Sequence, residues 1–350
     1  MEITTPGRIC LFGEHSDYLG LPIIAMAISL RAKILGQKRT DNQVIIHQPD
    51  INETETFSLK DLRYTKSRDY FKSCIKTCQN EGLVFSSGFE CEVSSTIPIR
   101  AGASSSSAIN VSWIHFLSKM ADNPIEWTQE KIGELTYQAE STEFNEPGGM
   151  MDQYTTAMGH IIHLESEPNI SIQSLNPELG SFVLGDSEQP KDTMGILKRL
   201  NDSRVEILNT LRAKNPTINI HTMNNDTNLA DLNNEQRKTY KGTVQNRNLL
   251  RKALVELEKN KPNYQLIGTL LTELHVVLRD IFDISTPKIE SMLEAAMSAG
   301  ALGGKITGSG GGGCMFAYAP VHPEKVAEAI EKVGGKAYIV HSDNGTQSFL

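Results

Sequence analysis

Residues 98–108, Pro-Ile-Arg-Ala-Gly-Ala-Ser-Ser-Ser-Ser-Ala, constrain this chain more than any other stretch. Small residues lead into four serines, and apolar residues then recur at helical spacing from Ile109 to Leu117. A helix start leaves backbone N–H groups unpartnered and partly positive, so small residues there let a phosphate approach closely. Serine hydroxyls can also ligate a magnesium ion that rides on the phosphates. By itself, however, the run of four serines is better explained as a serine-rich helix cap and linker.

The composition fits a soluble globular chain with room for two domains. The chain has 350 residues, 39% apolar and 22% charged, and a domain commonly takes roughly 150 residues. The net charge of −8 argues against non-specific nucleic-acid binding but not against a local phosphate site. The N-terminus lacks a signal-peptide pattern, no stretch approaches the ~20 apolar residues of a membrane span, and the five scattered cysteines indicate reduced thiols. We therefore expect a cytoplasmic protein with no nucleic-acid or membrane partner, and a monomer.

Short strands and helices alternate irregularly along the chain, which predicts an α+β fold. The character changes near residue 165, so we expect two domains, residues 1–165 and 166–350. Predicted strands lie at 8–12, 43–47, 89–93, 160–164, 182–184, 314–318 and 337–340, and predicted helices at 66–82, 109–117, 128–143, 200–213, 235–259, 264–282, 288–299 and 323–333.

Charged side chains gather around a glycine-flanked turn after the first predicted strand. Arg8 lies in this strand, and Glu14, His15 and Asp17 follow Gly13. Two carboxylates and an imidazole facing one point suit the hydroxyls of a small polyol, because each group accepts or donates a hydrogen bond. The alternative is a solvated loop, since segments rich in Gly, Asp and Ser are often only that.

Two acidic residues and a Gly-Gly break form a third candidate feature. Glu140 lies near the end of a predicted helix, and Asp152 follows Gly148 and Gly149. A carboxylate after such a break can enter a cleft without being tied to a helix face. One acid could then bind a metal while the other faces a substrate hydroxyl, although each acid alone is more often an ordinary surface residue.

Residues 305–313, Lys-Ile-Thr-Gly-Ser-Gly-Gly-Gly-Gly, form a dense glycine loop between apolar segments. Five glycines cost chain entropy on folding, and close approach of the backbone to a ligand or to another loop is the expected compensation. A flexible tether is a poorer interpretation, because predicted strands flank the loop tightly. The stretch is not a P-loop, since its lysine precedes the glycines.

In this order and spacing, the four stretches resemble the GHMP small-molecule kinases, which include galactokinase, homoserine kinase, mevalonate kinase and phosphomevalonate kinase. That superfamily carries a Pro-Gly-Arg-type motif, a Pro-x3-Gly-Leu-Ser/Gly-Ser-Ser-Ala loop and a Lys-x-Thr-Gly-x-Gly-x-Gly-Gly loop. Residues 13–18 (GEHSDY) and 147–153 (PGGMMDQ) most resemble the galactokinase segments Gly-Glu-His-Thr-Asp-Tyr and Pro-Cys-Gly-Ile-Met-Asp-Gln. The resemblance covers most of the chain and is weakest between residues 165 and 260.

The resemblance implies an N-terminal ribosomal-protein-S5-like α/β domain, a C-terminal ferredoxin-like α+β domain and an active site in the cleft between them. It implies transfer of the ATP γ-phosphoryl group to the anomeric hydroxyl of a monosaccharide, galactose above all, with Mg²⁺ as cofactor. It assigns catalysis to Asp152 and Arg8, sugar binding to Glu14, His15, Asp17 and Gly149, ATP binding to Gly102, Ser104, Ser105, Ser106 and Ser107, the glycine loop to Gly308, Gly310 and Gly312, and the metal to Ser106 and Glu140.

Several positions depart from the galactokinase pattern. Ala103 and Ser107 replace a usual Leu and Ala but are small enough to leave the loop intact, and residues 19–21 replace a more polar segment. Residues 184–187 and 191–193 look closer to mevalonate-kinase-type chains, so no tyrosine is assigned to the sugar. The alternatives are a sibling sugar kinase for a uronic acid, arabinose or another hexose, a mevalonate-kinase-like enzyme, whose substrate has no ring of hydroxyls, and a non-catalytic sensor of sugar and ATP.

Overall fold

The computed structural model describes residues 1–99, 101–146, 148–190 and 193–349, with the backbone alone for residues 193 and 194. Arg100, Pro147, Lys191 and Asp192 belong to motifs quoted above and lie outside the described residues. In the part of the chain that is described, no helix is both long and apolar enough to cross a bilayer.

Two long antiparallel strands, β1 (Glu2–Phe12) and β2 (Ile23–Lys38), form the centre of the larger sheet. Their apolar residues are almost completely buried between Ile9 and Ile28, as expected for strands covered on both faces. The sheet runs β12-β1-β2-β5-β3-β4, and β6 pairs with both β2 and β7. The bounds are β3 Gln43–Gln48, β4 Glu53–Ser58, β5 Phe89–Ser95, β6 Ile161–Glu165, β7 Ser171–Leu175 and β12 Gln347–Phe349.

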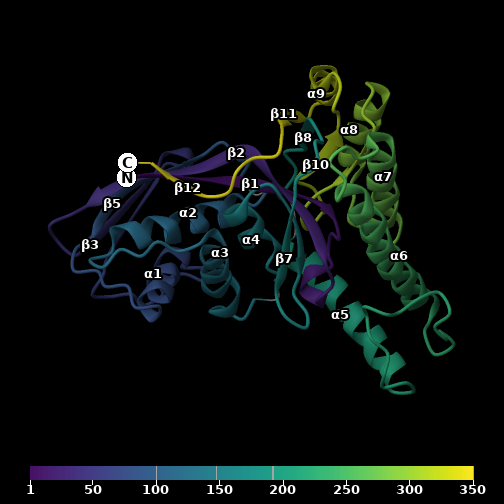
Figure 1. The fold of residues 1–350 in the computed structure, drawn as a ribbon, viewed down its shortest axis with the longest axis horizontal. Coiled ribbons are helices and arrows are strands. Elements are labelled where there is room, and N and C mark those ends of the chain that lie inside the picture. Colours follow the sequence, from purple (N-terminus) through teal and green to yellow (C-terminus); the bar gives the residue numbers. More distant parts are fainter. Residues whose placement is uncertain (100, 147, 191–192, 350) are drawn as a thin grey trace.

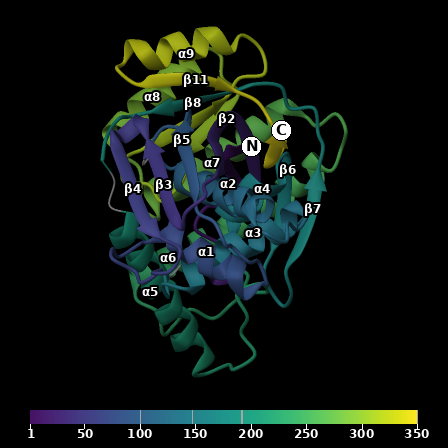
Figure 2. The same ribbon diagram turned by 90° about the vertical axis from the view of Figure 1, so that its left-hand side faces the viewer.

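Four helices gather on one face of this sheet: α1 (Tyr70–Asn80), α2 (Ser105–Met120), α3 (Gln129–Tyr137) and α4 (Met151–Met158). Helices α2 and α4 pack directly on β1 and β2, and the buried aromatic rings of Phe71, Phe89, Trp113 and Phe116 fill the space between α1, α2 and the sheet. Figures 1 and 2 show this layer below the sheet. Helix α3 continues into a π-helical turn, Gln138–Thr142, which carries Glu140.

A smaller antiparallel sheet, ordered β11-β8-β10-β9, organises the second half of the chain. Its strands are β8 (Phe182–Asp186), β9 (Gly303–Ile306), β10 (Cys314–Tyr318) and β11 (Lys336–Val340). Helices α7 (Tyr264–Asp280), α8 (Pro287–Ser298) and α9 (Pro323–Lys332) pack on it, while α5 (Thr193–Arg212) and α6 (Asn234–Leu257) extend away from it (Figure 1). One hydrophobic cluster joins residues of β1 and β2 to residues of both β8 and β10.

The chain ends by returning to the larger sheet. After β11, His160 donates a backbone hydrogen bond to Asp343, and Arg31 forms an ion pair with Asp343 at 2.7 Å. Strand β12 then pairs with β1, with Glu2 opposite Phe349, so the two termini lie together (Figure 1). Strands β7 and β12 thus complete the larger sheet from positions beyond residue 165, whereas the division of the chain at that residue stays a prediction.

The α+β class is confirmed, and the secondary-structure predictions need corrections in both helices and strands. Asp152 was expected to be free of a helix face, but it lies in the first turn of α4. Helix α4 and the short strands β7, β9 and β12 were not predicted. Strands β7 and β12 consist mostly of polar, partly exposed residues and lack an apolar pattern. All five cysteines are buried, and Cys74 and Cys78 are ordinary residues of α1.

Candidate active site

The four predicted segments surround one cavity of about 520 Å³. It lies between β1, the start of α2, the start of α4 and the glycine loop. Most of the residues predicted for the site line it: Arg8, Glu14, His15, Asp17, Gly102, Ser104, Ser105, Ser106, Ser107, Glu140, Gly149, Asp152 and Gly308. Gly310 and Gly312 do not appear among its lining residues.

The serine loop, residues 101–107, enters α2 without a side-chain cap. Ser104 is the N-cap residue, with a left-handed backbone (φ 60°), and its side chain makes no capping bond. Its buried Oγ has no hydrogen-bond partner among the described residues. Unpartnered donors at a helix start favour an anion. In the first turn of α2, Ser106 is exposed and Ser107 is buried.

Strand β1 holds the serine loop from one side. The backbone N–H of Arg8 donates to the Ala103 carbonyl at 3.1 Å, and the Arg8 guanidinium donates to the Gly102 carbonyl at 2.5 Å. Gly7 permits this approach, because a Cβ atom there would lie 2.7 Å from the Ala103 oxygen.

The glycine loop holds the serine loop from the other side. Cys314 donates a backbone hydrogen bond to the Ala101 carbonyl at 2.7 Å, and a Cβ atom on Gly308 would lie 2.9 Å from the Cα atom of Gly102. Gly310 and Gly312 serve other contacts, since Cβ atoms there would collide with residues 284 and 189–190. The prediction that this loop approaches another loop closely is therefore confirmed.

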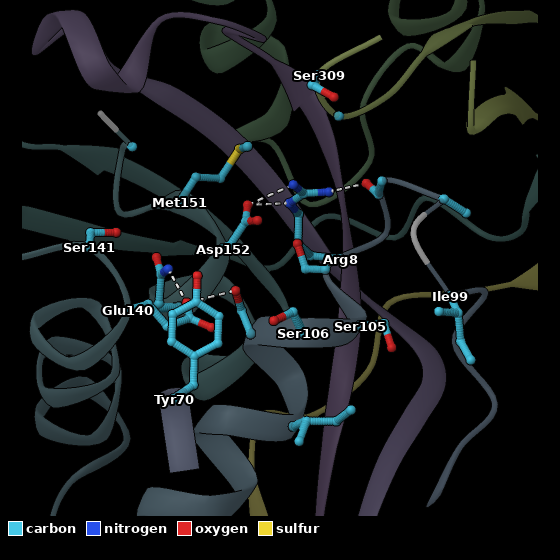
Figure 3. Close-up of a pocket in the computed structure, with 18 of the residues that line it drawn as sticks. Arg8, Tyr70, Ile99, Ser105, Ser106, Glu140, Ser141, Met151, Asp152 and Ser309 are labelled. Atoms are coloured by element: carbon cyan, nitrogen blue, oxygen red, sulfur yellow. Dashed lines mark hydrogen bonds and ion pairs between the residues drawn. The ribbon is translucent and has the colours of Figure 1, made fainter. Parts of the chain in front are cut away.

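Asp152 and Arg8 point toward each other from α4 and β1 (Figure 3). Arg8 Nε donates to Asp152 Oδ1 at 2.8 Å, and an Arg8 terminal nitrogen lies 2.6 Å from the same oxygen. The side chain of Arg8 is 5% exposed and that of Asp152 is 32% exposed. Asp152 therefore combines a fixed orientation with access to the cavity, which suits a group that meets a substrate hydroxyl.

Glu140 is buried behind the serines. Its carboxylate accepts hydrogen bonds from Ser107 at 2.9 Å, from Asn110 at 2.5 Å and from Gln153. Burial raises its pKa to about 7, although these three hydrogen bonds lower it in part. All three hydrogen-bond donors are neutral side chains. No cluster of three or more His, Cys, Asp or Glu side chains suited to a metal occurs within the described ranges.

The turn after β1 is held by the second half of the chain. Glu14 is 2% exposed, and its Oε2 atom lies 2.7 Å from Nζ of Lys305, which is completely buried at the end of β9. Asn246 of α6 donates to the Glu14 carbonyl at 2.8 Å. The sequence placed Lys305 in a motif without giving it a role.

His15 has both ring nitrogens engaged. Nε2 lies 3.1 Å from the Ser309 carbonyl, which can only accept, so Nε2 carries the proton and Nδ1 accepts from the Tyr18 hydroxyl at 3.3 Å. Arg204 donates to the same hydroxyl at 2.9 Å and to the His15 carbonyl at 2.7 Å. Burial, and then the charge of Arg204, lower the pKa of His15 to about 3. The ring is therefore neutral, and it can bind a substrate only by exchanging one of these bonds.

Asp17 lies directly against Gly149. A Cβ atom on Gly149 would lie 1.8 Å from Asp17 Oδ2, so glycine is what lets the two segments meet. Burial, and then the charge of Asp152, raise the pKa of Asp17 to about 6. The resemblance assigned both residues to the sugar without pairing them. It missed Arg204, which belongs to no motif, and it gave no role to Tyr18, the last residue of the motif at 13–18.

Comparisons with known proteins agree with this arrangement. Family models match residues 2–38 (galactokinase galactose-binding signature), 69–160 (GHMP kinases N terminal domain) and 250–336 (GHMP kinases C terminal). The last two together span just over half of the chain.

Relatives of two kinds are equally similar in sequence. A mevalonate kinase of Thermococcus gammatolerans is 28% identical over 96% of this chain and 94% of its own length. A galactokinase of Clostridium acetobutylicum is 28% identical over 95% of this chain and 88% of its own. Sequence identity therefore does not decide between a galactokinase and a mevalonate kinase.

A solved structure shows the same fold. The galactokinase of Lactococcus lactis complexed with galactose matches with a TM-score of 0.87 at 21% identity, covering 99% of this chain and 95% of that one. The two GHMP kinase models match more than half of the chain, so it belongs to the GHMP kinases, phosphotransferases that use ATP as co-substrate.

Proposed function

We propose that this GHMP kinase transfers the γ-phosphoryl group of ATP to the anomeric hydroxyl of a monosaccharide, with galactose as the first candidate. One observation carries the proposal: the galactose-binding signature, residues 2–38, contains Arg8, Glu14, His15 and Asp17, and all four line the cavity that Asp152 also lines. Polar groups that converge on one point from several segments suit an acceptor with several hydroxyls.

The triphosphate would lie along the serine loop. Gly102, Ser104, Ser105, Ser106 and Ser107 present an uncapped helix start and a buried, unpartnered hydroxyl to the cavity. Backbone N–H groups at such a start bind phosphate oxygens. Gly308 would keep this loop in place through its contact with the loop backbone.

Asp152 would orient the acceptor hydroxyl and accept its proton. The acceptor oxygen then forms a bond to the γ-phosphorus, the bond from that phosphorus to the β–γ bridging oxygen breaks, and ADP leaves. Arg8 would offset negative charge on both the carboxylate and the transferred group, because its guanidinium is already fixed beside Asp152. Positioning and charge neutralisation supply most of the acceleration in such transfers.

The residues present fit a magnesium ion. Glu140 is a buried carboxylate whose recorded partners are neutral, and Mg²⁺ is commonly held by one or two carboxylates together with substrate phosphates. Ser106 and Glu140 would hold it, with Ser107 fixing the carboxylate from the side. When bound, the ion neutralises phosphate charge.

Glu14, Asp17 and Gly149 would meet the hydroxyls of the acceptor. Glu14 lines the cavity, and its carboxylate is paired with Lys305. The Asp17 carboxylate also lines the cavity and lies against Gly149. His15 would act mainly by keeping the turn against the glycine loop through Ser309.

A mevalonate-type acceptor is the second candidate, because mevalonate kinases are as similar in sequence as galactokinases. The polar groups that converge on the cavity would equally suit a uronic acid, arabinose or another hexose, the acceptors of sibling sugar kinases. A non-catalytic sensor is disfavoured, since Arg8, Glu140 and Asp152 are all present and placed around the cavity.

The test is ADP formation from Mg²⁺-ATP with a panel of acceptors: galactose, other hexoses, arabinose, a uronic acid and mevalonate. We expect galactose to give ADP and a product that no longer reacts as a reducing sugar, because its anomeric oxygen carries the phosphate. If mevalonate gives ADP and none of the sugars does, the second candidate replaces the proposal. Binding of ATP and sugar without any ADP would identify a sensor.

A further inference from the structure

Lys305 is a charged residue enclosed within the protein rather than at its surface. Its side chain is 0% exposed, and Nζ donates to Glu14 Oε2 and to the Ile306 carbonyl, each at 2.7 Å. The ammonium group also lies 5.2 Å from the centre of the Phe316 ring. A buried charge is costly unless it is paired, and this one is paired with a carboxylate that lines the candidate acceptor site.

Lys305 contacts the carboxylate of Glu14, whereas the other contacts named for this turn reach other groups of it. Asn246 donates to the carbonyl of Glu14, and His15 and Tyr18 are engaged by Ser309 and Arg204. Among the described residues, the hydrogen bond recorded to the Glu14 carboxylate comes from Lys305. Lys305 therefore fixes the direction in which this carboxylate meets the cavity.

Lys305 also connects that carboxylate to the glycine loop. It is a residue of β9, and the loop begins directly after the strand. Thr307 accepts a hydrogen bond from the backbone of Cys10 at 3.3 Å, so β9 and β1 are joined next to the ion pair. Two residues 291 positions apart in the chain thus link the acceptor side of the cavity to the loop that braces the serines.

We infer that Lys305 is a positioning residue of the acceptor site, which acts by holding the Glu14 carboxylate toward the substrate hydroxyls. The inference rests on the proposed function, because it requires an acceptor at Glu14. It does not depend on which acceptor the panel identifies.

A double-mutant cycle on Lys305→Met and Glu14→Gln tests this role, with galactose as acceptor or whichever panel compound is phosphorylated. In Lys305→Met we expect the acceptor KM to rise about 10- to 100-fold, the range for a lost hydrogen bond to a charged group. The ATP KM and kcat should stay within about threefold. Lys305→Arg should restore most of the acceptor KM, since it keeps a buried donor with positive charge.

The cycle distinguishes positioning from general damage. If Lys305 acts through Glu14, the double variant should have the acceptor KM of Glu14→Gln alone. Lys72→Met is the matched control, because Lys72 is a buried lysine paired with Asp69 at 3.0 Å and does not line the cavity. It should lower stability and leave the acceptor KM unchanged.

Additive effects in the cycle, or equal rises in the KM values for ATP and acceptor, would overturn the inference. If Lys305→Met does not fold, the double variant Lys305→Met/Glu14→Gln, which lacks both charges, is compared with Glu14→Gln. A higher acceptor KM in the double variant would refute the inference that Lys305 acts through Glu14. If no panel compound is phosphorylated, the proposed function fails and this inference falls with it. With any phosphorylated acceptor, the cycle alone decides the role of Lys305.

Discussion

Asp17 offers a direct test of the electrostatics of the acceptor site. Burial and the nearby charge of Asp152 raise its pKa to about 6, while backbone hydrogen bonds from Tyr18 and Met151 work in the opposite direction. A carboxyl group that resists ionisation in the folded state makes stability depend on pH. We predict that Asp17→Asn removes this part of the pH dependence.

The sign and size follow from the two pKa values. The ordinary pKa of this carboxyl is 3.8, and in the folded protein it is about 6. Below pH 3.8 both states are protonated and Asp17 carries no penalty. Between pH 3.8 and pH 6 the unfolded chain ionises while the folded carboxyl still holds its proton, so the folded state loses stability over this window. Above pH 6 the loss is complete at roughly 2 to 3 kcal/mol, the value of about two pKa units.

The assay is urea unfolding of the ligand-free protein at pH 4 and at pH 7.5. Between these values the free energy of unfolding of the wild type should fall by roughly 2 kcal/mol more than that of Asp17→Asn. Asp202→Asn, at an exposed position of α5, is the control and should follow the wild type. If wild type and Asp17→Asn change in parallel, the carboxylate is not destabilised by its surroundings and the reasoning is wrong.

Three substitutions test the remaining parts of the site. Asp152→Asn should remove turnover while ATP still binds, and near-native kcat would refute its role. Gly149→Ala should raise the acceptor KM at least about tenfold, because the new methyl group must displace the neighbouring aspartate; Gly148→Ala is its control, since a Cβ atom there meets its nearest atom at 3.4 Å. Gly308→Ala should raise the ATP KM, whereas Gly82→Ala, at a similar positive φ but with open space around its Cβ atom, should cost stability and leave the ATP KM unchanged.

The sequence predicts those parts of the site whose chemistry is local. A run of small residues before an apolar helical pattern indicates a helix start, and glycines between strands indicate close backbone contact. Both expectations are met at Ser104 and Gly308. The meeting of the segments in one cavity followed from the motif order, which is a property of the whole family rather than of any single segment.

Long-range side-chain pairs were not predictable in the same way. Nothing local to Lys305 indicates that its partner is Glu14, because the contact depends on how β9 docks against β1. Likewise, the sequence named Ser106 and Glu140 as a pair, but the serine that contacts Glu140 is Ser107. Which hydroxyl faces inward depends on the residue at which the helix begins. Four successive serines do not indicate that residue.

The charges around the cavity predict which acceptors of the panel should react best. A carboxylate-bearing acceptor needs a cation, and the cations that line the described part of the cavity are already paired: Arg8 with Asp152 and Arg68 with Glu146. Recruiting Lys305 instead would leave Glu14 buried without its partner, which is strongly unfavourable. The carboxylates Asp17 and Asp152 would in addition repel an anionic acceptor. A neutral polyol avoids both costs, so galactose should have a higher kcat/KM than a uronic acid or mevalonate, and the reverse order would mean that one of these ion pairs opens when substrate binds.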